Sequence, residues 1–246
     1  MFSNRYIFIY STVMVIIVAA VLSSAAMFLQ PRQERNMRIA KIQGILAAVN
    51  LEATAENAEQ LYDQTIRSEI AINQDGEVVS VYQEGILVEG ELRPFDVDLK
   101  KELYNKKMGE PFVSALYMAD IDGEAVYIVP LRGTGLWGPV YGNIALGPDF
   151  NEIVGADFSH DKETPGLGAE IAYKEFSDQF IGKTIFDDAG NFVSVEVVKG
   201  GASTLPPERQ IHGVDAVSGG TITSNGVTDM LQNCLENYVE YAKNNI

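Results

Sequence analysis

The sequence predicts an α+β protein in which one N-terminal membrane-spanning helix precedes a mixed α/β domain. Three observations support this fold class. Residues 6–29 form a long uncharged apolar stretch, paired segments of β-strand character flank Asp-Gly turns in the middle of the chain, and residues 227–242 have the period of an amphipathic helix. With 246 residues, of which 46% are hydrophobic, the chain can bury a full core and is not expected to be disordered.

The apolar stretch at residues 6–29 is 24 residues long and carries no charge. About 20 apolar residues in a helix span a bilayer. The small residues at 23–26 would suit a cleavable signal peptide, but the apolar region of a signal peptide covers only about 7–15 residues. We therefore expect an uncleaved anchor with its short tail at residues 1–31, followed by a helical connector at residues 32–65.

Basic residues lie on both sides of the apolar stretch. One arginine precedes it, and four basic residues follow it: Arg32, Arg35, Arg38 and Lys41. Taken alone, the positive-inside tendency places the large domain in the cytoplasm, although long domains translocate largely regardless of charge. Charge bias alone therefore leaves the orientation of the anchor open.

The segment after the anchor is expected to continue as a helix over residues 37–49, with Ile42, Ile45, Leu46 and Val49 on one face. Residues 51–60 are polar and rich in alanine, and they predict a second short helix or a connector. Residues 85–110 show no clear period, and we expect them to form a surface excursion.

Two β-hairpins are predicted in the middle of the chain. Residues 69–72 and 78–82 flank Asp75-Gly76, and residues 113–118 and 124–131 flank Asp122-Gly123. The second turn, Asp-Ile-Asp-Gly, resembles part of a calcium-binding loop, but the other ligand positions of such a loop are missing. Because Asp-Gly is a strong hairpin signal, we expect a turn here and no metal.

A glycine-bearing turn is expected to lead into the last helix. Residues 215–226 have the sequence Asp-Ala-Val-Ser-Gly-Gly-Thr-Ile-Thr-Ser-Asn-Gly, and Thr223 or Ser224 is the candidate N-cap. Glycines without a Cβ allow a bulky anion to come close, and free N–H groups at a helix N-terminus favour negative charge. The segment therefore predicts either an anion site or only a strand-to-helix turn.

The only tryptophan of the chain, Trp137, lies in a glycine cluster at residues 132–142. Its glycine neighbours offer little surface for packing. The indole could stack on a flat ring, which gains dispersion and offset-stacking energy, or it could cap the core end of a hairpin. The residues by themselves leave both interpretations open.

Several classes of site are not expected. A net charge of −16 argues against a nucleic-acid-binding surface. The chain has a single cysteine, Cys234, which excludes an internal disulfide and a cysteine-based cluster, and it has two histidines, His160 and His212, far apart in the sequence. We expect no metal site and no catalytic residue, and we expect Cys234 to be a buried core residue.

Three stretches together resemble the C subunit of the bacterial sodium-pumping NADH:quinone oxidoreductase. They are Gly-Thr-Gly-Leu-Trp-Gly-Pro at 133–139, Glu-Thr-Pro-Gly-Leu-Gly at 163–168, and Asp-Ala-Val-Ser-Gly-Gly-Thr-Ile-Thr-Ser at 215–224. The third is similar to the acceptor motif of proteins that carry FMN in a phosphodiester bond to threonine, attached by a flavin transferase that uses FAD. That motif normally has alanine where this chain has Gly220. With the anchor included, the similarity covers essentially the whole chain.

The resemblance implies an FMN-binding domain of α+β fold at residues 66–246, on the exterior of the cytoplasmic (inner) membrane. It implies that covalent FMN relays electrons within a complex, with other membrane subunits and a flavin transferase as partners. Thr221 is implied as the acceptor, with Thr223 and Thr204 as the nearby hydroxyls to exclude. The other implied cofactor-binding residues are Leu136, Trp137, Gly138, Glu163, Thr164, Gly166, Leu167, Gly168, Lys183, Ser218, Gly219, Gly220 and Thr223.

Two alternatives belong beside this interpretation. The G subunit of the related electron-transport complex that couples to ferredoxin shares the acceptor motif. A membrane-tethered binding or assembly module could use the same turn to hold an anion without a covalent bond. No Gly-x-Gly-x-x-Gly follows a predicted strand and opens a helix, so this chain is not expected to oxidise NADH alone.

Overall fold

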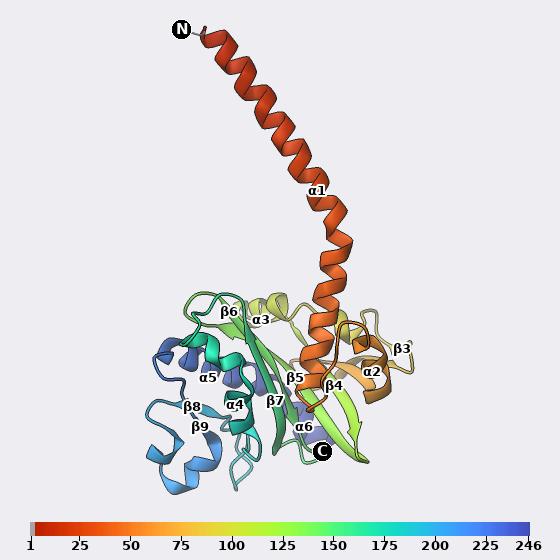
Figure 1. Ribbon diagram of the computed structural model, residues 1–246. Helices are drawn as coiled ribbons and strands as arrows, with labels where there is room; N and C mark the ends of the chain where they lie inside the picture. The colour runs from red at the N-terminus through yellow and green to blue at the C-terminus, as the bar shows by residue number, and fades with distance from the viewer. Residues whose placement is uncertain (1–2) are drawn as a thin grey trace. The chain divides into compact units, whose positions relative to one another are not determined.

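A computed structural model describes residues 3–246 and divides the chain into two compact units. The first unit ends at Lys41, and the second is Ile42–Ile246. Helix α1 (Asn4–Ala47), drawn in red and orange in Figure 1, runs through this boundary. It contains the predicted apolar stretch and is, within residues 3–246, the one helix long and apolar enough to cross a membrane by length and composition. The predicted continuation of the helix is confirmed as far as Ala47.

The second unit is built around a seven-stranded antiparallel sheet with the order β3-β2-β1-β4-β5-β6-β7. The strands are β1 (Ile66–Asn73), β2 (Val78–Gln83), β3 (Ile86–Glu89), β4 (Val113–Ile121), β5 (Glu124–Thr134), β6 (Pro139–Leu146) and β7 (Ile153–His160). A parallel pair, β8 (Glu196–Val198) and β9 (Gly213–Asp215), forms a second small sheet. The predicted fold class, α+β with a long N-terminal helix, is confirmed.

Both predicted hairpins are present. Strands β1 and β2 pair around the turn at residues 73–77, and β4 pairs with β5 around Asp122-Gly123. Asp122 and Gly123 both have positive φ, 53° and 88°, as a two-residue hairpin turn of this hand requires. Within residues 3–246 no group of three or more His, Cys, Asp or Glu could hold a metal ion, and the calcium-like loop is a hairpin turn.

Residues 85–110 lie mostly on the surface, as expected, but they contain regular structure that the sequence did not predict. This segment contains β3, the short 3₁₀ helix η1 (Pro94–Asp96) and helix α3 (Leu99–Met108). No residue of helix α3 is fully buried, and Leu103 packs only partly against the core, so a clear apolar period does not reveal the helix. It is defined by its ends instead: Asp98 accepts hydrogen bonds from two backbone N–H groups of the first turn, and Gly109 ends the helix with φ 71°.

The sheet carries helices on both faces. Helix α5 (Thr221–Leu235) packs against β5, where a Cβ placed on Gly133 would lie 2.6 Å from Met230 Cβ. The opposite face holds the end of α1 from Ile42 onward, helix α2 (Ala58–Thr65) and η1. The ring of Tyr62 in α2 lies edge-on to the ring of Phe95 in η1. The site stretches lie at the end of the sheet where α5 begins.

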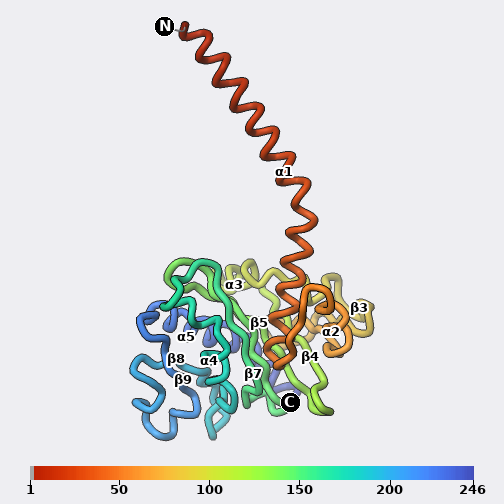
Figure 2. Tube along the Cα trace, viewed as in Figure 1, coloured from red at the N-terminus to blue at the C-terminus, as the bar shows by residue number. Residues whose placement is uncertain are grey.

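The edge of the sheet at β7 is covered by η2 (Gly168–Ala172), α4 (Lys174–Ser177) and η3 (Asp178–Phe180), and Figures 1 and 2 both show α4 beside this strand. Two further 3₁₀ helices, η4 (Ala202–Thr204) and η5 (Pro207–His212), contact β9. Helix α5 is followed by η6 (Glu236–Tyr238) and α6 (Val239–Asn245), and the Tyr238 hydroxyl donates to Ala115 O in β4 at 2.6 Å. The apolar period predicted through residue 242 is therefore divided, because η6 separates α5 from α6.

Candidate functional site

The three sequence stretches singled out above meet at one buried carboxylate. Glu163 Oε1 accepts a hydrogen bond from the backbone N–H of Trp137 at 2.8 Å, and Glu163 Oε2 accepts one from the hydroxyl of Thr223 at 2.6 Å. Glu163 is 5% exposed and Thr223 is 1% exposed. One side chain thus joins the turn between β5 and β6, the loop after β7 and the first turn of α5.

Glycines surround this carboxylate because no room is left for a side chain. A Cβ on Gly135 would lie 2.6 Å from Glu163 Oε1, and a Cβ on Gly168 would lie 2.5 Å from Glu163 Oε2 and also against the Thr223 hydroxyl. Ordinary van der Waals contact for a Cβ begins near 3.4 Å. These two positions therefore require glycine so that their backbone can pack against the Glu163 carboxylate.

The glycine pair before α5 likewise has little room for a Cβ. Gly219 has φ 73°, and a Cβ on it would lie 2.5 Å from Leu167 Cδ2. A Cβ on Gly220 would lie 3.2 Å from Val217 Cβ and 3.3 Å from Gly168 Cα. The loop after β7 thus lies directly on the turn that leads into α5.

Helix α5 begins at Thr221, and its N-cap is Gly220, without a side-chain cap. The expectation that Thr223 or Ser224 caps the helix is wrong. The Thr223 hydroxyl donates to Glu163, and Ser224 Oγ accepts from the N–H of Val217 at 3.2 Å, which closes the preceding turn. Both side chains are inside the first turn and buried.

The start of α5 keeps the features of an anion site. Within the described chain, the backbone N–H groups of residues 221–223 have no hydrogen-bond partner, and the first turn contains no acidic residue. Free N–H groups and the positive end of the helix dipole both favour a negatively charged group at this position. A phosphate fits these donors better than it would fit a helix end closed by a side-chain cap.

Large apolar side chains near this helix end are open to solvent. Trp137 is 63% exposed, Ile222 is 56% exposed, Leu136 is 48% exposed and Leu167 is 42% exposed. Trp137 lies in a tight turn closed by a hydrogen bond of 2.8 Å from Gly135 N to Gly138 O. The alternative in which Trp137 caps the core end of a hairpin is therefore wrong, because its indole ring is not packed into the core.

Comparison with known proteins agrees with this geometry. Residues 135–236 match the family model of the FMN-binding domain, a range that contains most of the three stretches. The chain is 30% identical over 216 residues to the C subunit of the Na⁺-translocating NADH-quinone reductase from Haemophilus ducreyi, covering 86% of this chain and 82% of the relative. It is also 30% identical over 237 residues to the corresponding C subunit from Pseudomonas aeruginosa, covering 89% and 88%.

The chain belongs to the C-subunit family of the Na⁺-translocating NADH-quinone reductase. A crystal structure of the Parabacteroides distasonis member is 39% identical, superposes with a TM-score of 0.73, and covers 87% of this chain and 96% of that one. Shewanella oneidensis NqrC is 27% identical with a TM-score of 0.62, covering 84% and 94%. Membership in this family confirms the predicted resemblance, and neither the G subunit of the ferredoxin-coupled complex nor a non-catalytic module is favoured.

Membership in the C-subunit family makes this chain an FMN-carrying component of an oxidoreductase complex. The residues that would hold FMN were predicted from motifs, and the structure brings most of them together. Thr164 lies in the loop after β7, where its carbonyl accepts from the N–H groups of Leu167 and Ala169 at 3.1 and 3.2 Å. Gly166, with φ 75°, donates to Glu170 at 2.9 Å. Exposed Ser218 and Gly219 lie just before Gly220, the N-cap of α5.

One amine and one hydroxyl considered for the site make their hydrogen bonds elsewhere in the protein. Lys183 Nζ donates to the carbonyl of Gln210 in η5 at 2.9 Å. The Thr204 hydroxyl donates to Gly201 O at 2.7 Å in η4. Neither interaction involves the three site stretches. By contrast, Thr221 is half-buried at the first position of α5, directly beside the free N–H groups.

Sequence reasoning missed the part played by His160. In the sequence we consider this histidine only as a metal ligand, but its Nδ1 accepts the backbone N–H of Glu163 at 3.2 Å and so helps to place that residue. The three-residue spacing between His160 and Glu163 is a signal for such a local turn.

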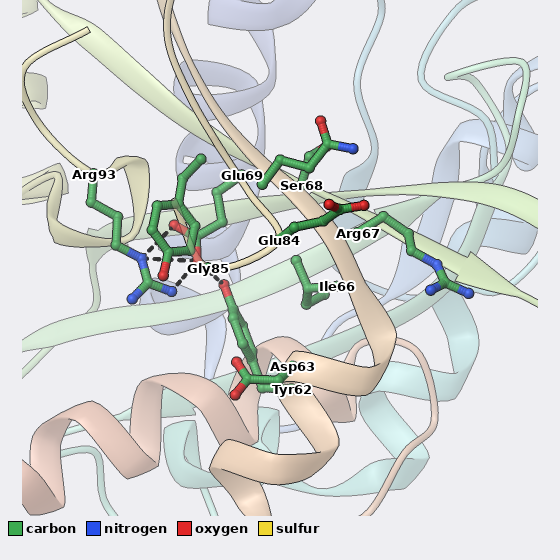
Figure 3. A pocket seen from close by; sticks show the side chains of 11 residues that line it. Tyr62, Asp63, Ile66, Arg67, Ser68, Glu69, Glu84, Gly85 and Arg93 are labelled. Carbon is green, nitrogen blue, oxygen red and sulfur yellow. Dashed lines mark hydrogen bonds and ion pairs between the residues drawn. The ribbon is translucent and has the colours of Figure 1, made fainter. Parts of the chain in front are cut away.

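A cavity of about 410 Å³ lies away from these stretches and is shown in Figure 3. On its wall the carboxylate of Glu69, 1% exposed, accepts from the Arg93 guanidinium, the Tyr62 hydroxyl at 3.0 Å and the backbone N–H of Phe95 at 3.1 Å. The hydrogen bond to Glu69 raises the pKa of Arg93, and burial raises the pKa of Tyr62. This cluster attaches η1 and α2 to β1, so we assign it a role in stabilising the fold.

Cys234 is a core residue, as expected. It is 1% exposed, and its Sγ lies 3.5 Å from both the N and the O of Arg132 in β5. Burial raises the pKa of its thiol to about 11. A thiol protonated at neutral pH is a poor nucleophile, so Cys234 serves packing between α5 and the sheet.

Proposed function

We propose that this chain carries FMN bound covalently through its phosphate to the side-chain oxygen of Thr221, and that it relays electrons through this FMN within the reductase complex. The single observation that carries the proposal is the contrast between two hydroxyls at the start of α5. Thr223 is buried and bonded to Glu163, whereas Thr221 is half-buried beside three free backbone N–H groups.

Attachment follows simple phosphoryl-transfer chemistry. The Thr221 hydroxyl oxygen attacks the flavin-side phosphorus of FAD, the bond to the AMP phosphate breaks, and AMP leaves. The hydroxyl proton passes to a base on the flavin transferase that catalyses the step. Thr221 meets the requirement for an acceptor, because an incoming phosphorus needs a hydroxyl that is not already held in a buried hydrogen bond.

The start of α5 would hold the phosphate once it is attached. A phosphodiester keeps one negative charge, which the free N–H groups of residues 221–223 and the helix dipole stabilise. No acidic residue in the first turn opposes that charge. The exposed backbone of Ser218 and Gly219 offers further donors at the same place.

The exposed apolar side chains Leu136, Trp137 and Leu167 would contact the ring system. An indole face or a leucine that is open to water gains dispersion energy when a flat aromatic ring covers it. FMN supplies the redox chemistry, and the chain supplies binding, orientation and the surrounding charge. The weakest member of the predicted set is Lys183, whose ammonium is bound to η5.

The proposal extends to the membrane placement of the protein. The apolar part of α1 would anchor the chain in the cytoplasmic membrane, with the large domain on the exterior side, where the flavin transferase would meet it. The other membrane subunits of the complex would be its stable partners. Family membership supports this placement, although the basic residues after the apolar stretch favour the opposite orientation.

Peptide mass spectrometry tests the proposal. Full-length protein extracted from membranes that contain the flavin transferase should yield one peptide, covering the start of α5, that is heavier by FMN less one water. Fragmentation should place that mass on Thr221. An adduct on Thr223 or Thr204, or no adduct in a chain that still binds FMN, would contradict the covalent assignment.

A further inference from the structure

We propose that Glu163 is a positioning residue that fixes the turn bearing Trp137 against the start of α5, and that it does so by hydrogen-bond geometry rather than by its charge. This inference rests on the proposed function, because those two elements are the ones that would contact the ring and the phosphate of FMN. It differs from the expectation that Glu163 itself binds the cofactor.

The contacts of Glu163 leave it no free face for a ligand. One oxygen accepts from Trp137 N and the other from Thr223 Oγ1, at 2.8 and 2.6 Å. Gly135 and Gly168 pack against the same two oxygens so closely that neither position has room for a Cβ. With 5% of its surface exposed, the side chain is enclosed by protein.

The partners of Glu163 differ in how firmly the rest of the fold holds them. Thr223 is buried in the first turn of a 15-residue helix that packs on the sheet. Trp137, in contrast, lies in a short turn with its side chain 63% exposed. The carboxylate therefore acts as a link from a rigid element to an exposed turn, and the position of Trp137 depends on it.

Substitution separates geometry from charge. Glutamine has the length of glutamate, and its Oε1 can accept from Trp137 N while its Nε2 donates to Thr223 Oγ1, since a hydroxyl both donates and accepts. Alanine removes both bonds and leaves the Trp137 N–H and the Thr223 hydroxyl without a partner. A positioning residue should tolerate glutamine and fail with alanine.

The first experiment needs no flavin. In full-length, detergent-solubilised protein that carries Thr221→Ala and therefore no adduct, hydrogen exchange of the Trp137 amide is measured with and without Glu163→Ala. Loss of this buried hydrogen bond should speed exchange at Trp137 at least about tenfold. Glu163→Gln should stay within about threefold of the Thr221→Ala protein.

Glu102 provides the matched control. Its Oε2 accepts the backbone N–H of Val113 at 3.0 Å, between α3 and β4, and so makes the same kind of bond at a different junction. Glu102→Ala should speed exchange at Val113 and leave Trp137 unchanged. Unchanged Trp137 exchange in Glu163→Ala would overturn the proposal. So would a Glu163→Gln protein that behaves like Glu163→Ala, because charge would then be the property that matters.

The second experiment uses protein that has been matured with flavin. Glu163→Ala should still carry its adduct by mass, but quenching of Trp137 fluorescence and the visible circular dichroism of the flavin should both fall several-fold. Glu163→Gln should match the parent. A parent protein that lacks an adduct on Thr221 would sink the proposed function while leaving the exchange result intact, so the two failures are distinguishable.

If Glu163→Ala does not fold, Thr223→Val removes the other hydrogen bond of the link, the one between Thr223 Oγ1 and Glu163 Oε2. Valine keeps the shape of threonine and removes only the hydroxyl, and the carboxylate retains its bond to Trp137 N. Exchange at Trp137 should then rise by a smaller factor than loss of both bonds would cause, about fivefold. No rise at Trp137 in a folded Thr223→Val protein would also count against a link through Glu163.

Discussion

The hydroxyl of Thr223 donates to Glu163 Oε2 at 2.6 Å, and both side chains are almost fully buried. Thr223 lies only two residues after Thr221, and the sequence makes the two threonines similar candidates for modification. This hydrogen bond separates them, because an acceptor must present a hydroxyl that a transferase can reach.

Substituting each threonine with valine should produce opposite results. Thr221→Val should fold, insert into the membrane and remain colourless. Thr223→Val should keep its flavin and lose roughly 1.5–3 kcal/mol of unfolding free energy, because Glu163 loses a buried donor. In-gel flavin fluorescence and denaturant unfolding of the detergent-solubilised chain measure the two effects. A yellow Thr221→Val protein would show that another residue is esterified.

Trp137 should report directly on the flavin. Because it is the only tryptophan of the chain and is exposed beside Leu136, its emission should be strongly quenched when the ring lies against it. The colourless Thr221→Val protein should be several-fold brighter in the tryptophan band than flavin-loaded parent protein at equal concentration. Equal emission from the two proteins would place Trp137 away from the ring.

The orientation of the large domain is testable on whole cells. We expect it on the exterior of the cytoplasmic membrane, so protease added to intact spheroplasts should digest it. A cytoplasmic marker protein, digested only after lysis, is the control for intact membranes. If the domain is protected until lysis, the basic residues that follow the apolar stretch determine the orientation.

The apolar stretch should remain attached to the mature protein. Residues 6–29 carry no charge and lie within one continuous helix, α1, with a length that suits a membrane span. N-terminal sequencing of protein extracted from membranes should therefore begin at or next to Met1. A mature N-terminus near Met27 would identify the stretch as a cleaved signal peptide instead.

Asp157 should make stability depend on pH. It lies in β7 opposite Asn143, and a Cβ placed on Gly44 of α1 would be 3.2 Å from its Oδ2. Burial raises the pKa of its carboxyl from 3.8 to about 6. The folded protein thus holds this proton more tightly than the unfolded chain does, and stability from this group is present below about pH 4 and lost as pH rises through about 6.

Asp157→Asn should remove that dependence. At pH 8 the variant should gain on the order of 1–3 kcal/mol in unfolding free energy over the parent, and near pH 4 the two should be similar. Asp188→Asn, at an exposed aspartate, is the matched control and should change neither value much. A parent protein whose stability rises between pH 4 and pH 7 more steeply than that of Asp157→Asn would contradict the sign of this effect.

Local patterns in the sequence determined several features that the structure confirms. The apolar stretch within α1, the two hairpins at Asp-Gly turns and the helix after Gly220 all follow from composition, turn chemistry or period over a few residues. Membership in the C-subunit family was visible in three short motifs for a similar reason, since each motif is contiguous. Helix α3 was not predicted because none of its residues is fully buried and its clearest signals are its caps.

The tertiary structure decided which residues of those motifs contact one another. Contacts between residues far apart in the sequence show that Gly135 and Gly168 make room for Glu163, that Gly219 accommodates Leu167, and that Thr223 faces inward while Thr221 does not. Glu163 and Thr223 are separated by 60 positions, and no local period relates them. Because a hydrogen bond of this range depends on how the whole sheet brings its loops and α5 together, only the folded chain distinguishes the two threonines.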